Sequence, residues 1–338
     1  MIKIYKILVL LFTVQIITSC SYKNSNKYEN IKLENTLTLG ESEEDINQSF
    51  IFPISIVADK NGNIYICDTN AIEVKKFDKN GKFLWSLNKR GQGPGEFNRP
   101  IDIALDKIGN IYVSDQNNRK IEIFSEKGEY RGGFKTEIGA PMEIAVNSKG
   151  FIYIEFFHSI NKNILHKLNS KGELVSSFVK VNKEEENDFI QSAKNNVSFC
   201  IDHEDNIIIC FDYTYKIQKY SPDEKLIYEF ARKLPYTPKP LKVVHPQPNS
   251  MMIEGDVITQ DVIVDKKNNI YVLWGGKADE KGLIIDVFNP KGEFLGSLRS
   301  GVKPSYNLQR VFLDEDDNLY ILEPLMEPKL FRFHIEYH

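Results

Sequence analysis

The sequence has few of the side chains from which metal centres and nucleophilic sites are built. Only four cysteines and six histidines occur among its 338 residues, and no two histidines have the spacing of zinc ligands. A Gly-x-Ser-x-Gly motif, which would indicate the nucleophile elbow of a hydrolase, is absent. The glycine-rich segment 91–95 is not followed by a helical pattern, so it does not fit a phosphate-binding loop. We therefore predict no bound cofactor.

An excess of charge of one sign is also missing. Lys and Arg total 43 and Asp and Glu total 47, which gives a formal net charge of −4, and no dense basic block occurs. Nucleic acid is therefore not an expected partner, because binding its phosphates needs a basic face. Aromatic residues, by contrast, make up 12% of the chain, which is typical of a folded, strand-rich protein.

The only long apolar run lies at residues 7–17, and it is too short to cross a bilayer. Lys3 and Lys6 precede this apolar run, and the run ends in the sequence Ile-Thr-Ser-Cys at residues 17–20. This pattern resembles a bacterial lipoprotein leader, in which the cysteine is acylated after cleavage. We predict a signal peptide at 1–19 and lipidation of Cys20. An ordinary signal peptide with an incidental cysteine is the alternative.

The polar segment after Cys20 predicts a tether. Residues 21–30 consist of Ser, Asn, Lys, Tyr and Glu without apolar periodicity, so we divide the chain into a lipid-anchored tether at 20–30 and a folded domain at 31–338. Two or more acyl chains anchor a protein stably where one does not. We expect a protein attached to the membrane through Cys20 in the bacterial cell envelope, at the outer membrane, facing the periplasm or the cell surface.

Three further cysteines leave at least one free thiol. Cys200 and Cys210 flank a turn, and a hairpin would place them on one face, opposite each other or one diagonal step apart. A disulfide in an oxidising envelope and two buried thiols both fit this arrangement.

An internal repeat is the strongest signal in the sequence. An Asp- or Asn-headed turn between two apolar strands, the second of which usually carries a Tyr, recurs at intervals of 41 to 63 residues. Intervals of this length are typical of propeller blades. The six copies lie at residues 59–65, 106–112, 147–153, 202–208, 265–271 and 314–320.

The turn residues explain why the block recurs. The leading Asp or Asn can accept a hydrogen bond from the backbone N–H two residues on. The fourth slot needs a residue that tolerates a left-handed backbone, and it holds Gly62, Gly109, Gly150, Asp205, Asn268 and Asp317. A second turn follows in the first five repeats, so each of these holds four strands and forms one blade of a β-propeller.

The last repeat indicates how the ring closes. It has room for only three strands, near residues 308–313, 319–323 and 329–335. Residues 34–39 match the outer-strand pattern of 293–298, so we predict that this N-terminal strand completes the sixth blade. Residues 231–260 contain five prolines and lack the turn block, which makes them an insertion rather than a seventh blade. The expected fold is an all-β, six-bladed propeller of four-stranded antiparallel blades.

Parts of the second repeat resemble a known repeat family. Segments 91–97, 100–106, 111–115 and 118–124 are similar to an NHL repeat. Residues 53–87 are similar too, with Asp68, Asn70 and Phe77 in the matching positions, whereas the other repeats are degenerate. As a whole the chain resembles the six-bladed β-propeller lipoproteins of Bacteroidetes-type genomes. Such propellers include lyases, lactonase-like enzymes and pure binding modules, so the resemblance implies the fold more than the activity.

A ligand site is expected on one end of the propeller. Loops that join second to third strands, and blade to blade, share that end with the mouth of the central channel. Three insertions fall there, at 181–196, 231–260 and 275–282, and we expect 231–260 above all to carry function. The candidate ligand contacts are Arg99, Asp115, Arg119, His158, His245, Trp274 and Glu323, with Asp68 in a matching slot.

The resemblance assigns some of these candidates a structural role instead. In NHL repeats the residues matching Asp115 and Arg119 tie the loop and neighbouring blades together. Trp274 stands where sister blades carry Asp, so we predict that its ring offers a stacking platform for a sugar or an apolar side chain.

Two functions remain open at this point. The first is an envelope-anchored binding or scaffold module, expected as a monomer, that presents a loop-rich face to an envelope protein, a peptide or a glycan. The alternative is a metal-dependent lyase or lactonase-like hydrolase with its site at the channel mouth. The residues available as ligands of calcium or zinc, or as catalytic bases, would then be His158, His245, Glu155 and Glu323.

Overall fold

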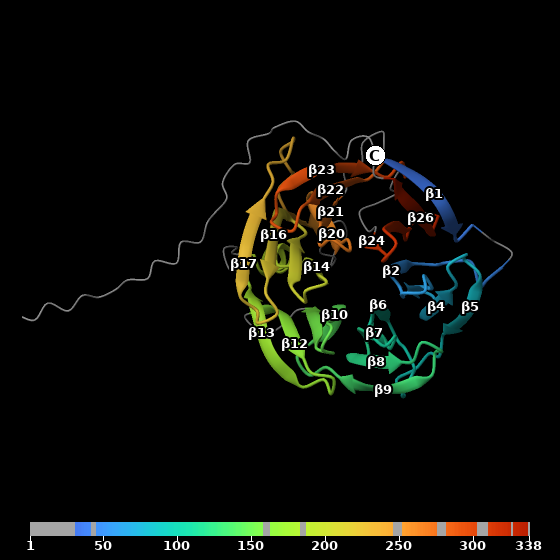
Figure 1. Cartoon of the computed structure of the whole chain (residues 1–338). Helices are drawn as coiled ribbons and strands as arrows, with labels where there is room; N and C mark the ends of the chain where they lie inside the picture. The colour runs from blue at the N-terminus through green and yellow to red at the C-terminus, as the bar shows by residue number, and fades with distance from the viewer. Residues whose placement is uncertain are drawn as a thin grey trace, which may run out of the picture.

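The computed structural model describes residues 31–41, 45–157, 163–182, 187–245, 252–275, 282–302, 310–325 and 327–336. Six four-stranded antiparallel sheets surround a central channel as the blades of a propeller (Figure 1). Within each of the first five blades the strands pair in chain order from the channel outward. The predicted fold class is therefore confirmed.

The first three blades follow one another directly along the chain. Blade 1 comprises β2 (Pro53–Ala58), β3 (Ile64–Asp68), β4 (Glu73–Phe77) and β5 (Phe83–Leu87). Blade 2 comprises β6 (Pro100–Leu105), β7 (Ile111–Asp115), β8 (Lys120–Phe124) and β9 (Tyr130–Lys135). Blade 3 comprises β10 (Ala140–Val146), β11 (Ile152–Phe157), β12 (Asn163–Leu168) and β13 (Leu174–Lys180).

The second half of the ring contains the insertions. Blade 4 comprises β14 (Val197–Ile201), β15 (Ile207–Phe211), β16 (Thr214–Tyr220) and β17 (Leu226–Ala231). Blade 5 comprises β20 (Thr259–Val264), β21 (Ile270–Trp274), β22 (Ile284–Phe288) and β23 (Phe294–Arg299). Blade 6 comprises β24 (Arg310–Leu313), β25 (Asn318–Glu323), β26 (Lys329–Glu336) and β1 (Lys32–Leu39).

The position of each strand in its blade explains its residue pattern. Second strands such as β3 and β21 are buried along their whole length, because neighbouring blades cover both faces of the sheet. Outer strands such as β9 and β17 alternate between exposed and half-buried residues, since one of their faces meets solvent. The core is consequently a set of apolar clusters between adjacent blades.

The turn blocks adopt the predicted geometry. Asp59 Oδ1 accepts hydrogen bonds from the backbone N–H of Asn61 at 2.9 Å and of Asn63 at 3.0 Å. The Tyr65 hydroxyl donates to Asp59 Oδ2 at 3.1 Å, which explains why the block pairs an Asp with a Tyr. All six residues of the fourth slot have positive φ, between 60° at Asp317 and 85° at Gly109.

The ring closes as predicted. β1 pairs antiparallel with β26, from Lys32 opposite Glu336 to Leu39 opposite Leu330. Figure 1 shows the N-terminal strand on the outside of the blade formed by the C-terminal strands. The outer edge of β26 is thereby covered, which removes an exposed row of backbone donors and acceptors.

Two insertions carry secondary structure of their own. The segment between blades 3 and 4 contains the short helix α1 (Asp188–Lys194), and the segment between blades 4 and 5 contains a hairpin of β18 (Lys242–Val244) and β19 (Met252–Glu254). The hairpin forms a separate two-stranded sheet, so the insertion is not a seventh blade. Among the described ranges, no helix is long and apolar enough to cross a membrane.

The three cysteines of the folded domain are free thiols. Ser198 lies opposite Cys210 in the pairing of β14 with β15, and Cys200 lies opposite Ile208, which puts the two cysteines one diagonal step apart. Burial raises the pKa of both thiols well above the usual range. The sequence allows either a disulfide between Cys200 and Cys210 or two thiols, and the structure has two thiols. Cys20 lies outside the described residues.

Candidate ligand-binding site at the channel mouth

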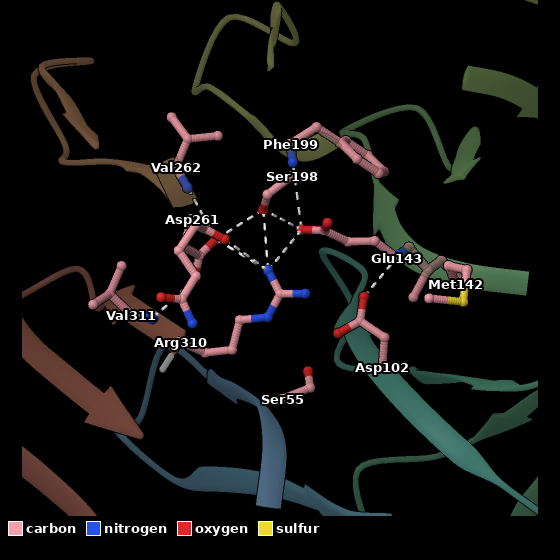
Figure 2. Close-up of polar contacts among 12 residues, drawn as sticks. Ser55, Asp102, Met142, Glu143, Ser198, Phe199, Asp261, Val262, Arg310 and Val311 are labelled. Carbon is pink, nitrogen blue, oxygen red and sulfur yellow. Dashed lines mark hydrogen bonds and ion pairs between the residues drawn. The ribbon is translucent and has the colours of Figure 1, made fainter. Parts of the chain in front are cut away.

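A ring of polar side chains surrounds the channel (Figure 2). The innermost strand of each blade is mostly apolar but contributes one polar residue to this ring. That residue stands four positions before the leading Asp or Asn of the following turn block, which we call the turn head. In four blades a register shift, such as the one between Pro53 and Ser55, lies beside this position. Bulges of this kind re-aim a side chain, here toward the channel. The six residues are Ser55, Asp102, Glu143, Ser198, Asp261 and Arg310.

Four members of this polar ring join adjacent blades. The side chain of each accepts a hydrogen bond from a backbone N–H of the next blade. That N–H belongs to the residue one position after the polar-ring residue of that blade. Arg310 lacks an acceptor and cannot do this, while Ser198 instead donates to Asp261 at 2.9 Å. The four bonds run from Ile103 to Ser55 (3.2 Å), Ile144 to Asp102 (2.7 Å), Phe199 to Glu143 (3.4 Å) and Val311 to Asp261 (2.9 Å).

Arg310 is the cation of the polar ring. Its Nη1 lies 3.9 Å from Glu143 Oε1 and 3.7 Å from Asp261 Oδ1, and it donates to Ser198 Oγ at 3.2 Å. Figure 2 shows the guanidinium pointing from β24 across to β14, β20 and β10. One guanidinium therefore faces carboxylates from several blades, and the polar ring is acidic overall.

Burial of these carboxylates disfavours their charged form. It raises the pKa of Asp102 to about 6, against hydrogen bonds from Ser55 and Ile144 and the charge of Arg310, which lower it. Burial also raises the pKa of Glu143 well above its usual range, and the negative charges of Asp102 and Asp261 add to this rise. The pKa of Asp261 is raised by burial as well.

A cavity of about 620 Å³ opens beside the polar ring. Its walls come from blades 1 to 4, from Arg310 of blade 6, from the loops that follow β7 and β15, and from α1. We call it the channel-mouth cavity. Sites for small molecules commonly have volumes of about 300–1,000 Å³. A second hollow of about 440 Å³ lies between blades 3 and 4, where its one carboxylate, Glu224, pairs with Lys167 at 3.1 Å.

Glu155 and Asp212 line the channel-mouth cavity behind the polar ring. Glu155 comes from β11, and Asp212 follows β15. Burial raises the pKa of Glu155 to about 8, and the negative charges of Asp212 and Asp102 add to the effect more than Arg310 offsets it. Burial likewise raises the pKa of Asp212 to about 7.

The Glu155→Gln variant is expected to be more stable than the wild type at pH 8. Between about pH 5 and 8 folded Glu155 keeps a proton that the unfolded chain releases, so the free energy of unfolding falls as pH rises. One pKa unit corresponds to about 1.4 kcal/mol. Glu155 is partly exposed, and solvent screening reduces the effect, so we expect a gain of about 1–2 kcal/mol at pH 8.

Urea unfolding at pH 5 and pH 8 measures this difference. Glu129→Gln provides the control, because Glu129 is exposed and its ion pair with Arg131 lies at the surface. A Glu155→Gln variant that is less stable than the wild type at pH 8 would contradict the assigned environment of this carboxyl group.

Of the predicted ligand contacts that the structure describes, Arg99 alone lines the channel-mouth cavity. Its guanidinium donates to the side chain of Gln116. Asp115 is buried and accepts hydrogen bonds from the backbone N–H of Asn98 at 3.0 Å and of Arg99 at 2.8 Å. It therefore holds the loop on which Arg99 sits. Arg119 is exposed, with a positive φ of 52°.

Trp274 and Glu323 are buried outside the cavity. The exposed fraction of Trp274 is 4%, its Nε1 donates to Asp286 at 2.6 Å, and its ring packs edge-on against Tyr215. The predicted stacking platform thus faces protein in this structure. Glu323 is 4% exposed and accepts a hydrogen bond from the N–H of Leu325 at 3.3 Å.

His245 of the proposed metal set does not line the channel-mouth cavity. His245 is exposed at the end of β18, and His158 lies outside the described residues. Among the residues that the structure describes, no group of three or more His, Cys, Asp or Glu is arranged to hold a metal ion. Of the carboxylates in that set, Glu155 lies in the cavity and Glu323 does not.

The sequence interpretation missed the polar ring and Asp212. The signal for the ring was present, because aligning the six turn heads places one polar residue four positions upstream in every repeat. The cavity also lies beside the 181–196 insertion, whereas the described residues of the 231–260 insertion, where the site was expected, do not line it. The local patterns of the two insertions do not show which of them lies over the channel.

Comparisons with known proteins agree with this architecture. A family described as 6-bladed beta-propeller matches residues 43–271, more than half of the chain. This match confirms the expected propeller resemblance. No curated protein matches the sequence.

Several solved structures share the fold at low identity. A Bacteroides fragilis protein described as exported has a TM-score of 0.63 at 10% identity, with 93% of this chain and 98% of that one covered. A Bacteroides vulgatus protein has a TM-score of 0.60 at 13% identity, covering 93% and 100%. Virginiamycin B lyase from Staphylococcus aureus has a TM-score of 0.53 at 12% identity, covering 90% and 100%. At these identities the likeness extends to the fold alone.

Proposed function

The chain belongs to this six-bladed β-propeller family, and we propose that it is an exported, envelope-anchored binding module that holds its ligand in the channel-mouth cavity. The ligand is a peptide, a glycan or part of an envelope protein. The observation that carries the proposal is the cavity itself, about 620 Å³ in volume, at the end where second-to-third strand loops and α1 meet. Rigid blades with a pocket among their loops suit recognition.

Substitutions on α1 test the location of the ligand site. Ser192 lines the cavity, whereas Lys194 on the same helix does not. A Ser192→Trp side chain would fill part of the cavity, and Lys194→Trp provides a matched control for the fold. A thermal-shift screen against peptides and glycans should yield ligands that stabilise the wild type and the control, by about 2.7 kcal/mol at 100 times the dissociation constant.

The Ser192→Trp variant should lose this stabilisation. Ligands that stabilise both tryptophan variants equally would place binding elsewhere and overturn the assignment of the cavity. A screen that returns no ligand at all would count against the binding function.

The membrane anchor is a separate part of the proposal. It rests on the leader pattern and on Cys20, together with the similarity to a Bacteroides protein described as exported. We expect metabolic labelling with an alkynyl palmitate to mark the wild-type chain and the Cys200→Ser variant, and Cys20→Ser to remain unlabelled and precursor-sized. Labelling that survives in Cys20→Ser would contradict the anchor.

A further inference from the structure

Two carboxyl groups in the channel-mouth cavity have no partner among the described residues. Glu155, on β11, and Asp212, which follows β15, line this cavity and are partly exposed. Neither accepts a hydrogen bond nor forms an ion pair within the described ranges, in contrast to Asp102, Glu143 and Asp261 of the polar ring. Buried carboxyl groups without donors are costly to a fold, so a donor from outside the chain would stabilise them.

The propeller fold does not require a carboxyl group at position 155. Glu155 stands eight residues after its turn head, and the same slot in the other five blades is small or apolar. Those five side chains are buried, and they complete the blade without any charge. The five residues are Cys67, Ser114, Cys210, Leu273 and Leu322.

The cations at the cavity are already engaged. Arg310 faces Glu143 and Asp261, and Arg99 donates to Gln116. His166 on the neighbouring strand β12 is buried, and burial lowers its pKa to about 4, so it carries no charge near neutral pH. The charged groups that face Glu155 or line the cavity with it are Asp102, Glu143, Asp188, Asp212, Arg99 and Arg310.

We propose that the channel-mouth cavity binds an organic cation with a primary ammonium group, which Glu155 and Asp212 hold. This inference rests on the proposed binding function and specifies its ligand class. An ammonium group supplies a positive charge and three donors, which matches two carboxylates without donors of their own. The remaining wall includes Ile54, Ile101 and Ile164, which suit an alkyl chain attached to the ammonium.

An organic cation fits this site better than a metal ion. Metal sites need several ligand atoms that converge at about 2.0–2.6 Å. Within the described part of the chain no such group exists, and the two carboxylates sit on different blades around a cavity large enough for a small molecule.

Binding of the cation is linked to protons. Because burial raises the pKa of Glu155 to about 8, this group is largely protonated at pH 6 and must release its proton to pair with an ammonium. Alkylamines stay protonated up to about pH 10, near the pKa of lysine. The affinity should therefore rise between pH 6 and 8.5, with release of a proton on binding.

Isothermal titration calorimetry of the full-length protein in detergent tests the inference. The probes are n-pentylamine, cadaverine and the peptide Gly-Lys-Gly, with 1-pentanol and calcium chloride as comparisons. We expect an amine to bind to the wild type at least tenfold more tightly than pentanol does. The same amine should bind to Glu155→Gln and to Asp212→Asn at least tenfold more weakly than to the wild type, in line with the cost of truncating a buried charge pair. Thermal midpoints of the variants check their folding.

The probes separate the two sources of the ammonium group. Binding of pentylamine or cadaverine alone would identify a free amine, and binding of Gly-Lys-Gly would identify a lysine side chain of a peptide. Equal binding of pentanol, or calcium binding that depends on Glu155, would overturn the inference. If no amine binds but another ligand is lost in Ser192→Trp, the cation class is wrong and the binding function stands.

Discussion

Replacing Arg310 with Met is expected to destabilise the protein by about 1–3 kcal/mol near pH 8. The substitution keeps much of the side-chain volume but leaves Glu143 and Asp261 without their common cation. The guanidinium of Arg310 is half-buried, but the side chains of Glu143 and Asp261 are only 13% and 8% exposed, so without Arg310 their charges would stay largely buried and unpaired.

The loss should be smaller at pH 5. Burial raises the pKa of both Glu143 and Asp261, so these groups can take up protons at low pH and no longer need a counter-charge. Chemical unfolding at pH 5 and pH 8 measures the difference. Arg131→Met serves as the control, since Arg131 forms an exposed pair with Glu129 and should change stability by less than about 1 kcal/mol. An equal loss for Arg310→Met at both pH values would contradict the electrostatic account of the polar ring.

Deleting β1 is expected to cost at least about 5 kcal/mol, which is comparable to the whole stability of many domains. β1 supplies the fourth strand of blade 6, and Leu39 is buried between this blade and blade 1 with Leu37 packed beside it. Burying a leucine contributes about 1.5–3 kcal/mol, and the exposed edge of β26 would in addition invite aggregation.

Two truncations separate this effect from the loss of the leader. A chain that starts at residue 31 keeps β1 and should show the thermal midpoint of the longer protein, whereas a chain that starts at residue 41 should unfold early or aggregate. The variant Leu39→Ala gives a graded measurement, with an expected loss of about 2–4 kcal/mol. Equal midpoints for the two truncations would show that β1 does not hold the ring closed.

The fold could be predicted from the sequence because its information is local and repeated. Each turn head fixes a hairpin through short-range hydrogen bonds, such as those of Asp59, and a left-handed residue such as Gly62 completes it. Six copies then fix the number of blades. Ring closure was also predictable, since a three-stranded last repeat needs one more strand and residues 34–39 have its pattern.

The candidate site could be predicted only in part, because it depends on long-range geometry. The end of the propeller was foreseen, but which loops fold over the channel depends on packing between blades. Trp274 illustrates the limit: its departure from the repeat suggested a ligand platform, whereas Tyr215 and Asp286 from the neighbouring chain segments enclose it. Glu155 showed the opposite case, in which a departure from an apolar slot does place a carboxyl group in the cavity.

The protonation of Glu155 tests the account of the channel-mouth cavity most directly. Carbon-13 labelling of glutamate carboxyl groups, followed by NMR from pH 4 to pH 9, gives the pKa of each resolved group, and the Glu155→Gln spectrum assigns the signal by its absence. We predict that this signal titrates near pH 8, far above the usual value for glutamate. A Glu155 signal that titrates near pH 4.5 would show that the carboxyl group is well solvated or paired, and would contradict the site described for this cavity.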